Sequence, residues 1–218
     1  MRSFLSDNCF FSTLDEDVIA SSEDFVCSKD SDIEIFFKQE YKQYSYQLLG
    51  KSYCFVTKSK PQKIVCAFTV SNSSIKVDNL PNKKRNKLNR KIPHSKQRSQ
   101  YPAVLIGQLA VFDEFAGMQL GDELLNFIKA WFIDPLNKTG CRYIIVDAVN
   151  KDPVKDFYKR NGFDFFFASD EEEVKYLTRQ KSKSFFQKIK DCLSNNTNEN
   201  QLLKKTRLMY FDLILLRS

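Results

Sequence analysis

The apolar run from Ala103 to Phe112 constrains the fold more than any other segment. It is nearly continuous in hydrophobic residues, which is typical of a strand buried on both faces of a sheet. A short loop, Asp113–Leu120, follows, and Gly121–Ile133 then has the apolar spacing of a helix that ends before Pro135. A strand, a loop and a helix in this order predict an α/β fold.

The rest of the chain continues this alternation. Helical spacing from Asp30 to Leu49 predicts a helix with Ser28 or Ser31 as its N-cap, and two β-rich segments predict a hairpin. The hairpin and the later elements are Ser52–Thr57 with Lys63–Ser71, a buried strand at Tyr143–Ala148, a helix that Asp152 caps and Gly162 ends, a strand at Phe163–Phe167, a polar helical insertion at about 171–200 with a disordered linker at 194–200, and a closing strand at 207–216. The segment Met1–Val26 shows no clear pattern. A length of 218 residues fits a single domain, 1–218.

Composition narrows the class of protein. With 42% hydrophobic residues, the chain can bury a core without disulfides or metal. Its six cysteines lie far apart and it has one histidine, so no segment has the ligand spacing of a zinc site, and we expect no metal. Most of the cysteines have apolar neighbours, as in a reduced, cytoplasmic protein. No apolar run approaches the roughly 20 residues that span a bilayer and no signal peptide is recognisable, so we expect no membrane contact.

The loop before the helix is the first candidate site. Gly117 and Gly121 let the backbone approach a ligand closely, and the N–H groups at the start of a helix are unpaired and carry partial positive charge. This geometry suits a pyrophosphate. Two glycines before an amphipathic helix are equally typical of an ordinary strand–helix turn, so the pattern alone does not decide between the two.

A second candidate element runs from Asp152 to Phe163. The predicted helix carries the aromatic pair Phe157-Tyr158, stops at Gly162 and is followed at once by an aromatic residue. Both members of the pair have an alternative place in the hydrophobic core, and we expect Phe157 to be a core residue.

Together, these two elements resemble motifs A and B of the GNAT N-acetyltransferases. Leu109-Ala110-Val111 with the glycine loop is similar to motif A, and Phe157-Tyr158 with Gly162-Phe163 is similar to motif B. The resemblance covers roughly residues 30–167 and the closing strand. It implies a GNAT fold, with a central mixed sheet splayed at the cofactor strand and flanked by helices. The sequence departs from motif A at Ala116, where the family prefers Arg or Gln, and at Gln119, where it prefers Gly.

The resemblance also implies a reaction. An N-acetyltransferase of this family moves the acetyl group of acetyl-CoA to a primary amine by direct attack through a tetrahedral intermediate. The Val111 N–H would stabilise the oxyanion, and the Tyr158 phenol would protonate the leaving thiolate. The expected cofactor contacts are Leu109, Ala110, Val111, Ala116, Gly117, Met118, Gln119, Leu120, Gly121 and Asn150. No general base is evident: we expect His94 to be a surface residue, and Asp113 and Glu114 are either bases acting through water or solvated side chains.

A basic segment, 79–101, bears on the acceptor. No acidic residue stands between Asp78 and Asp113, and the sparse apolar residues predict a surface loop or short helix. The layout resembles the TacT-like branch of toxin acetyltransferases, which implies aminoacyl-tRNA as the acceptor and a small DNA-binding antitoxin as a partner, and leaves a homodimer open. The tRNA phosphates would be bound by Lys83, Lys84, Arg85, Lys87, Arg90 and Lys91. A net charge of +7 is consistent with an anionic partner.

Other functions fit the same sequence. One alternative is an acetyltransferase for a protein or small-molecule amine. A second is a CoA- or RNA-binding module without turnover, and the departures from motif A favour this second alternative. Retention of Tyr158 favours an enzyme. The polar insertion suits a dimer contact, an antitoxin contact or a lid, and the sequence does not choose among them.

Overall fold

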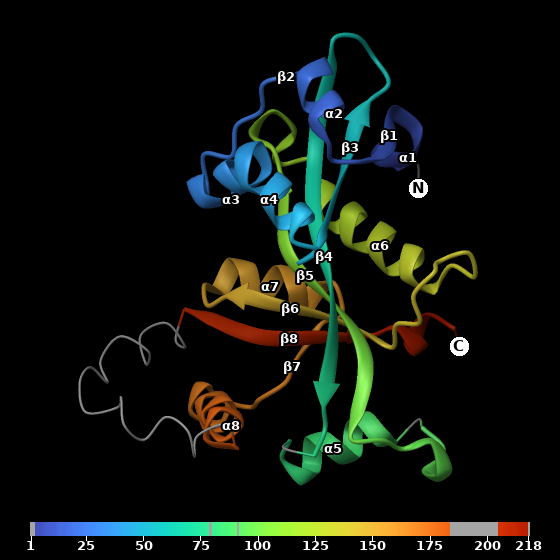
Figure 1. Cartoon of the computed structure of the whole chain (residues 1–218), viewed down its shortest axis with the longest axis vertical. Coiled ribbons are helices and arrows are strands. Elements are labelled where there is room, and N and C mark those ends of the chain that lie inside the picture. Colours follow the sequence, from blue (N-terminus) through green and yellow to red (C-terminus); the bar gives the residue numbers. More distant parts are fainter. Residues whose placement is uncertain (1–2, 79, 91, 184–204, 218) are drawn as a thin grey trace, which may run out of the picture. The chain divides into compact units, whose positions relative to one another are not determined.

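The computed structural model describes residues 3–78, 80–90, 92–183 and 205–217, and the chain forms two compact units (Figure 1). The first comprises Met1–Asn72 and Val104–Gly140, and the second comprises Ser73–Ala103 and Cys141–Ser218. Two long strands, β4 (Gln62–Lys76) and β5 (Gln100–Val111), contribute residues to both units. This division does not test the expectation of a single domain, which stays a prediction.

The first unit starts with elements that the sequence pattern does not predict. They are α1 (Phe4–Asn8), β1 (Cys9–Thr13), α2 (Glu16–Ser21) and β2 (Ser22–Glu23). The predicted helix and hairpin are confirmed as α3 (Ser31–Ile35), a π-helical turn (Phe36–Glu40), α4 (Tyr41–Tyr46) and β3 (Lys51–Thr57), which pairs with β4. The N-cap is Asp30 and neither predicted serine, because the Asp30 carboxylate accepts from the N–H groups of Asp32 and Ile33. A charged acceptor also interacts favourably with the positive end of the helix dipole.

The sheet of the first unit has the order β1-β3-β4-β5. Strands β1, β3 and β4 are antiparallel, while β2 pairs with β4 in parallel, so the sheet is mixed. Side chains alternate between its two faces. On one face the ring of Tyr53 packs against Trp131 of α6 (Leu120–Ile133), and on the other Cys54 and Val56 join a core cluster with Phe37. Apolar burial on both faces therefore places helices on both sides of this sheet.

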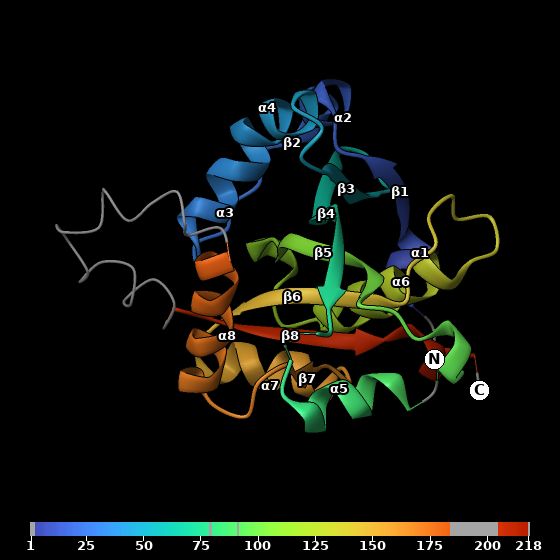
Figure 2. The same ribbon diagram turned by 60° about the horizontal axis from the view of Figure 1, so that its bottom comes forward.

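The second unit contains the remaining elements, which follow the order β5-β6-β8-β7 in its sheet. Figure 2 shows β6 and β8 side by side, and they are antiparallel with Tyr143 opposite Asp212. The elements are α5 (Asn82–Asn89), a 3-10 turn (His94–Lys96), β6 (Tyr143–Val149), α7 (Asp152–Arg160), β7 (Asp164–Phe165), α8 (Asp170–Lys183), β8 (Thr206–Asp212) and a final 3-10 turn (Leu213–Leu216).

Two predicted details of the second unit are wrong. Asp152 is the first residue of α7 and not its cap, because the carbonyl of Lys151 accepts the first hydrogen bonds of the helix, and the Asp152 carboxylate pairs instead with Lys155 over 2.9 Å. The closing strand ends at Asp212 and not at residue 216, since the Asp212 side chain accepts from the Ile214 N–H and turns the chain. The Gly162 stop is confirmed, with φ of 81° just beyond the helix. The predicted linker 194–200 lies outside the described residues.

The buried cysteines are confirmed as core residues. Cys9, Cys27, Cys54 and Cys66 are buried free thiols, and burial raises the pKa of Cys9 to about 11 and of Cys54 to about 12. Such thiols are poor nucleophiles at neutral pH. Among the described residues, no group of three or more His, Cys, Asp or Glu side chains is placed to hold a metal ion. In the same part of the chain, none of the helices combines the length and apolarity needed to span a membrane.

Candidate functional site

The turn between β5 and α6 brings most of the predicted cofactor residues into one loop of the first unit. Backbone hydrogen bonds fix the end of β5: the Phe112 N–H donates to the Val65 carbonyl over 3.1 Å, and the Asp113 N–H donates to the Val26 carbonyl over 3.0 Å. After a 3-10 turn (Asp113–Phe115), residues 116–119 are exposed. In β5 itself, Leu109 and Val111 are half-buried and Ala110 is buried.

Two left-handed residues shape this loop. Gly117 has φ of 83°, and Gln119, which immediately precedes α6, has φ of 56°. Glycine adopts this region freely, whereas an L-residue with a side chain pays roughly 1–2 kcal/mol there. The Gln119 side chain makes no cap hydrogen bond, so the left-handed backbone conformation of this residue, and not its side-chain amide, directs the chain into the helix. This explains in physical terms why the related motif prefers glycine at this position.

The loop has the features that a phosphate group requires. A Cβ built on Gly117 would meet no atom within 4 Å, so the space above its backbone is open. The N–H groups of Leu120 and Gly121 lie in the first turn of α6, where a helix provides no intrahelical acceptor for them. The dipole of this 14-residue helix adds positive potential at the same end. The backbone therefore fits a pyrophosphate group, although Ala116 offers no polar side chain.

A carboxylate in the same first turn is held by the N-terminal helix. Glu123 accepts hydrogen bonds from the Ser3 hydroxyl at 3.0 Å and from the N–H groups of Phe4 at 3.2 Å and Leu5 at 3.1 Å. The Phe4 ring also lies 6.2 Å from the ring of Phe115. Three donors thus compensate a negative charge that would otherwise oppose an anion at this helix end. Sequence reasoning missed this contact, and the one available signal was the acidic first turn of the helix.

The two carboxylates that follow β5, Asp113 and Glu114, both make structural contacts. Asp113 accepts from Ser28, whose N–H lies 3.0 Å away, and these hydrogen bonds lower the pKa of Asp113. Glu114 forms an ion pair with Lys63. A carboxylate with a lowered pKa is a weak base near neutral pH, so Asp113 is not suited to deprotonate an amine. His94 is exposed in its 3-10 turn, which confirms the predicted surface position.

Tyr158 belongs to the second unit, on α7. Its ring packs against Phe157 at 5.1 Å and Phe163 at 5.3 Å, and its carbonyl accepts the Phe163 N–H. Burial raises the pKa of the Tyr158 phenol to about 12, so the hydroxyl stays protonated at neutral pH and can serve as a proton donor but not as a base. Phe157 is half-buried and not the full core residue that we expect, and the exposed Arg160 lies over its ring at 5.0 Å.

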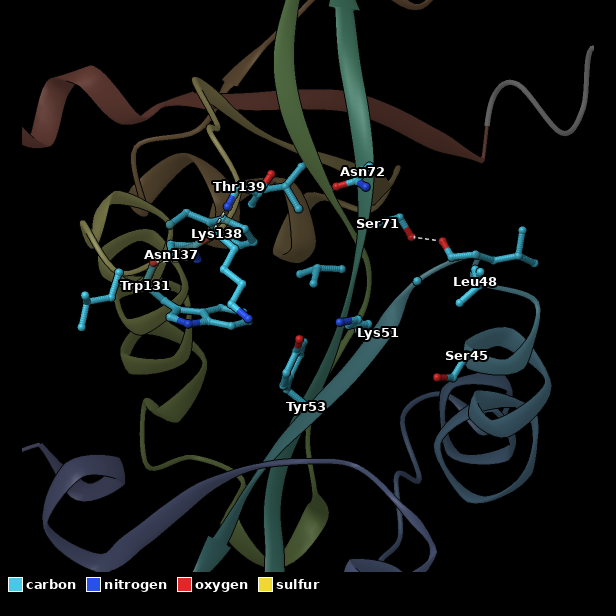
Figure 3. Close-up of a pocket in the computed structure, with 16 residues that line it drawn as sticks. Ser45, Leu48, Lys51, Tyr53, Ser71, Asn72, Trp131, Asn137, Lys138 and Thr139 are labelled. Atoms are coloured by element: carbon cyan, nitrogen blue, oxygen red, sulfur yellow. Dashed lines mark hydrogen bonds between the residues drawn. The ribbon is translucent and has the colours of Figure 1, made fainter.

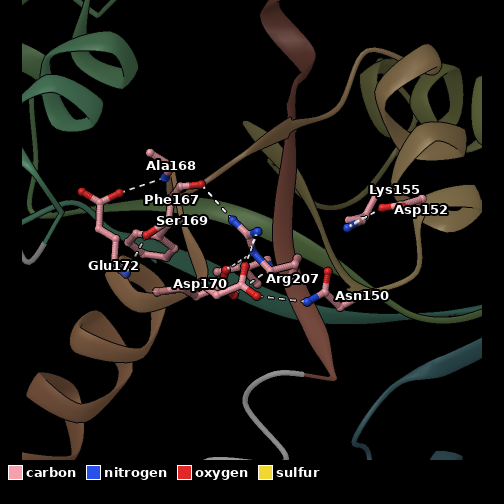
Figure 4. A network of polar contacts seen from close by, with 11 residues as sticks. Asn150, Asp152, Lys155, Phe167, Ala168, Ser169, Asp170, Glu172 and Arg207 are labelled. Atoms are coloured by element: carbon pink, nitrogen blue, oxygen red, sulfur yellow. Dashed lines mark hydrogen bonds and ion pairs between the residues drawn. The ribbon is translucent and has the colours of Figure 1, made fainter.

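Asn150, the remaining predicted cofactor contact, also belongs to the second unit. Its side-chain amide donates to Asp170 over 3.2 Å, and Asp170 in turn pairs with Arg207 (Figure 4). Arg207 is 8% exposed and bonds Glu173 over 2.9 Å and the Phe167 carbonyl over 3.1 Å. This network ties the start of α8 to β8. Asn150 therefore has a structural contact, and its contact with a cofactor stays a prediction.

The structure divides the six predicted phosphate-binding residues. Lys84 is turned inward: its ammonium contacts the Phe165 carbonyl and lies 5.2 Å from the centre of the Tyr210 ring, and burial lowers its pKa. Lys87 forms an ion pair with Asp164. The remaining members are Lys83 and Arg90, which are exposed, Arg85, which donates to Asn82 over 2.8 Å, and Lys91, which lies outside the described residues. Helical periodicity puts Lys83 and Arg90 on the outer face of the α5 region.

Known proteins resemble this chain in structure. The crystal structure of a KacT mutant matches with a TM-score of 0.61 and 17% identity over 97% of this chain and 98% of that one. AtaT complexed with acetyl-methionyl-tRNAfMet matches with a TM-score of 0.60 and 16% identity over 96% and 98%. An AtaT mutant toxin bound to the C-terminus of the antitoxin AtaR and acetyl-CoA matches with a TM-score of 0.53 and 14% identity over 97% and 99%. No family model matches the sequence, and no curated protein matches it.

Proposed function

Because the chain has the GNAT fold that it shares with KacT and AtaT, we propose that it is an acetyl-CoA-dependent N-acetyltransferase. The observation that carries the proposal is the β5–α6 turn. It combines an open Gly117 backbone, a left-handed Gln119 and the unpaired N–H groups at the start of α6, all suited to the cofactor's pyrophosphate. AtaT, which shares the fold, has been seen with acetyl-CoA bound.

In the proposed reaction, acetyl-CoA supplies the acetyl group as a thioester. Backbone groups of Leu109 and Val111 hold the arm that carries it, and the Val111 N–H donates to the carbonyl oxygen as negative charge develops there. The neutral acceptor amine attacks the carbonyl carbon, and the bond to sulfur breaks. Tyr158, with its pKa of about 12, gives its phenolic proton to the departing thiolate. The nitrogen gives up one proton to solvent water and the tyrosinate recovers its proton from solvent, so the products are the acetylated amine and the free CoA thiol.

The favoured acceptor is the α-amino group of an aminoacyl-tRNA in the cytoplasm. The support is the fold shared with AtaT, a protein seen with acetyl-methionyl-tRNAfMet, together with the exposed basic residues Lys83 and Arg90. Such an amine has a low pKa and needs little help from a base, which suits a site where Asp113 and Glu114 are engaged elsewhere. We extend the proposal to an antitoxin partner, since AtaT binds the C-terminus of AtaR.

A second candidate is an acetyltransferase for a protein or small-molecule amine. The inward position of Lys84 and the ion pair of Lys87 with Asp164 favour it, because both reduce the positive charge that α5 offers to RNA. Variants of the exposed residues Lys83 and Arg90 distinguish the two candidates, because only the tRNA acceptor depends on these positive charges.

Transfer of labelled acetyl groups to charged and to deacylated tRNA tests the acceptor. We expect label on charged tRNA alone. Neutralising Lys83 and Arg90 to Gln should weaken tRNA binding and reduce the slope of log affinity against log salt by about two, since each phosphate contact contributes about one. The matched control is a variant in which the exposed residues Lys60 and Lys151 are both replaced by Gln, because this removes the same amount of positive charge elsewhere on the chain. Intact acetyl-CoA binding with no label on either RNA would leave the enzyme proposal standing and reject tRNA as the acceptor.

A further inference from the structure

A hollow of about 700 Å³ lies in the first unit, away from the β5–α6 turn (Figure 3). It is bounded by the C-terminal end of α6, the segment 136–139 that follows it, the start of β3 and the loop between α4 and β3. A volume of this size is typical of ligand sites, which range from about 300 to 1,000 Å³. Nothing in the proposed acetyl transfer uses it.

The strongest sign of a binding role is Leu48, at the rim of the hollow. Leu48 follows the C-cap of α4, and its N–H donates to the Ser45 carbonyl while the next N–H, of Leu49, donates to Tyr44. This is the Schellman arrangement, in which the position of Leu48 normally carries glycine because φ is positive. Here φ is 57°, and the side chain is 90% exposed. A leucine at this position is strained and gains nothing from burial within the described chain, so its side chain is better explained by an external contact.

Other apolar groups continue the surface around Leu48. Leu136, which also lines the hollow, is 89% exposed, and Leu49 is 52% exposed. Between them the floor is formed by Val70 and Val104, with the edge-to-face pair of Tyr53 and Trp131 at 4.8 Å. Exposed aliphatic side chains grouped around a hollow mark an interaction site more than a solvated surface.

The charges at this site have one sign. Lys51 and Lys138 line the hollow and both are exposed, and among the described lining residues there is no aspartate or glutamate. In Figure 3 the Lys51 and Lys138 side chains border the same opening, beside Tyr53 and Trp131. An occupant with carboxylates beside an apolar group would therefore be complementary in both respects.

The aromatic packing argues against a nucleic acid base as the occupant. Trp131 is surrounded by the rings of Phe11, Tyr53, Phe68, Phe127 and Phe132. The Phe127 ring stacks on Trp131 at 6.3 Å and occupies one face of the indole, whereas single-stranded RNA binds to aromatic faces that are open for stacking. The most exposed apolar groups at the hollow are the aliphatic side chains of Leu48, Leu49 and Leu136, which suit a leucine or phenylalanine side chain. A second copy of this chain that docked through the same face would bring its own Lys51 and Lys138 against like charges, which is unfavourable.

We propose that this hollow, bordered by Leu48, Leu136 and the two lysines, docks a segment of a partner protein that carries a large apolar side chain flanked by carboxylates. The apolar side chain enters between Leu48 and Leu136, and the carboxylates reach Lys51 and Lys138. The inference does not depend on acetyl transfer, and its test has no activity readout.

Trp131 reports on the site directly, because it is the only tryptophan of the chain. We would titrate the full chain with the blocked peptide acetyl-Glu-Leu-Phe-Asp-Glu-amide and follow tryptophan emission and heat of binding. Matched peptides replace the acidic residues with Lys, or Leu and Phe with Ser. Saturable binding of the first peptide, weakened at least tenfold for both controls, is the expected result.

Two variants link the binding to the residues named. Leu48→Gly removes the apolar group and relieves the left-handed strain, so its unfolding midpoint should be no lower than that of the wild type while peptide affinity falls by about tenfold. Lys138→Glu should weaken binding several-fold, on the order of three- to tenfold, and less so at high salt. Lys60→Glu, at an exposed lysine outside the hollow, should leave affinity unchanged.

Three results would overturn the proposal. One is peptide binding that is absent or insensitive to Leu48→Gly and Lys138→Glu. Another is a change of Trp131 emission with an RNA oligonucleotide that the peptide does not displace. The third is a doubling of mass in light scattering that Leu48→Gly abolishes, which would assign the hollow to a second copy of the chain.

Discussion

Lys129 offers a sharp test of how the first unit is packed. It lies on α6 with 6% of its surface exposed, and burial lowers the pKa of its ammonium group from 10.5 to about 8. The Asn126 side-chain oxygen at 3.4 Å and the charge of Asp122 offset part of the cost of burying this cation. Lys129→Met removes the charge and keeps most of the apolar side chain.

The magnitude follows from the difference between the two pKa values. A folded pKa of about 8 against 10.5 in the unfolded chain differs by about 2.5, which at about 1.36 kcal/mol for each unit sets an upper limit of about 3.4 kcal/mol. Between these pH values the unfolded chain binds more protons, so wild-type stability rises with pH. Below pH 8 Lys129 is charged in the folded protein, and the full free-energy cost of burying its ammonium group is present. Lys129→Met should therefore raise the free energy of unfolding by about 2–3 kcal/mol at pH 7, and this advantage should shrink steadily toward pH 10.5.

Urea unfolding of the wild type and Lys129→Met at several pH values from 7 to 10 measures this difference. Lys60→Met, at an exposed lysine in the turn between β3 and β4, should run parallel to the wild type. NMR of the lysine ε-carbons gives the pKa directly, from the resonance that Lys129→Met lacks. A difference between the two proteins that is the same at every pH, or a resonance that titrates near 10.5, would refute the reasoning.

Four further predictions follow from single contacts. Gln119→Gly should raise the calorimetric unfolding midpoint, with a gain of about 1 kcal/mol, because glycine adopts φ of 56° without strain; a lower midpoint would contradict this. Glu123→Ala should speed amide hydrogen exchange at the start of α1, where Glu123→Gln should preserve part of the protection. Arg207→Met should destabilise the second unit by roughly 3–5 kcal/mol in urea unfolding, because the buried Glu173 carboxylate keeps the Leu208 N–H but loses its cationic partner, and Met at both positions should recover most of the loss. The Tyr158 pKa of about 12 predicts no fall in kcat/KM from its deprotonation below about pH 11; a basic limb near pH 10 that Tyr158→Phe removes would oppose this.

The elements around the proposed cofactor loop could be predicted because their signals are local. A continuous apolar run, two glycines and a 3.6-residue period specify β5, the turn and α6 within a short stretch of sequence. The same holds for α7, where Pro153 fits the first turn and Gly162 ends the helix. Each of these features determines the conformation of its own backbone neighbours, so contacts with distant parts of the chain do not change the predicted element.

The features that could not be predicted depend on distant partners. Glu123 holds α1, and Asp113 holds the segment at Ser28, and neither partner is near in sequence. Lys84 and Lys83 are adjacent in one basic segment, yet the first lies against Tyr210 and the second is exposed. A charge count treats these two lysines alike, because only the packing of α5 against β7 and β8 distinguishes them.

Initial rates of labelled acetyl transfer from acetyl-CoA to charged tRNA, for the wild type and Tyr158→Phe, test the central claim most directly. Transfer should occur with the wild type, and Tyr158→Phe should lower kcat by about a hundredfold or more, since general acid catalysis contributes on the order of 10²–10⁴. The apparent KM for acetyl-CoA should change little, because the variant keeps the ring and loses only the proton donor. Equal rates for the two proteins would contradict the role of Tyr158. A wild type that binds acetyl-CoA but acetylates neither charged tRNA nor any other amine would contradict the enzyme itself.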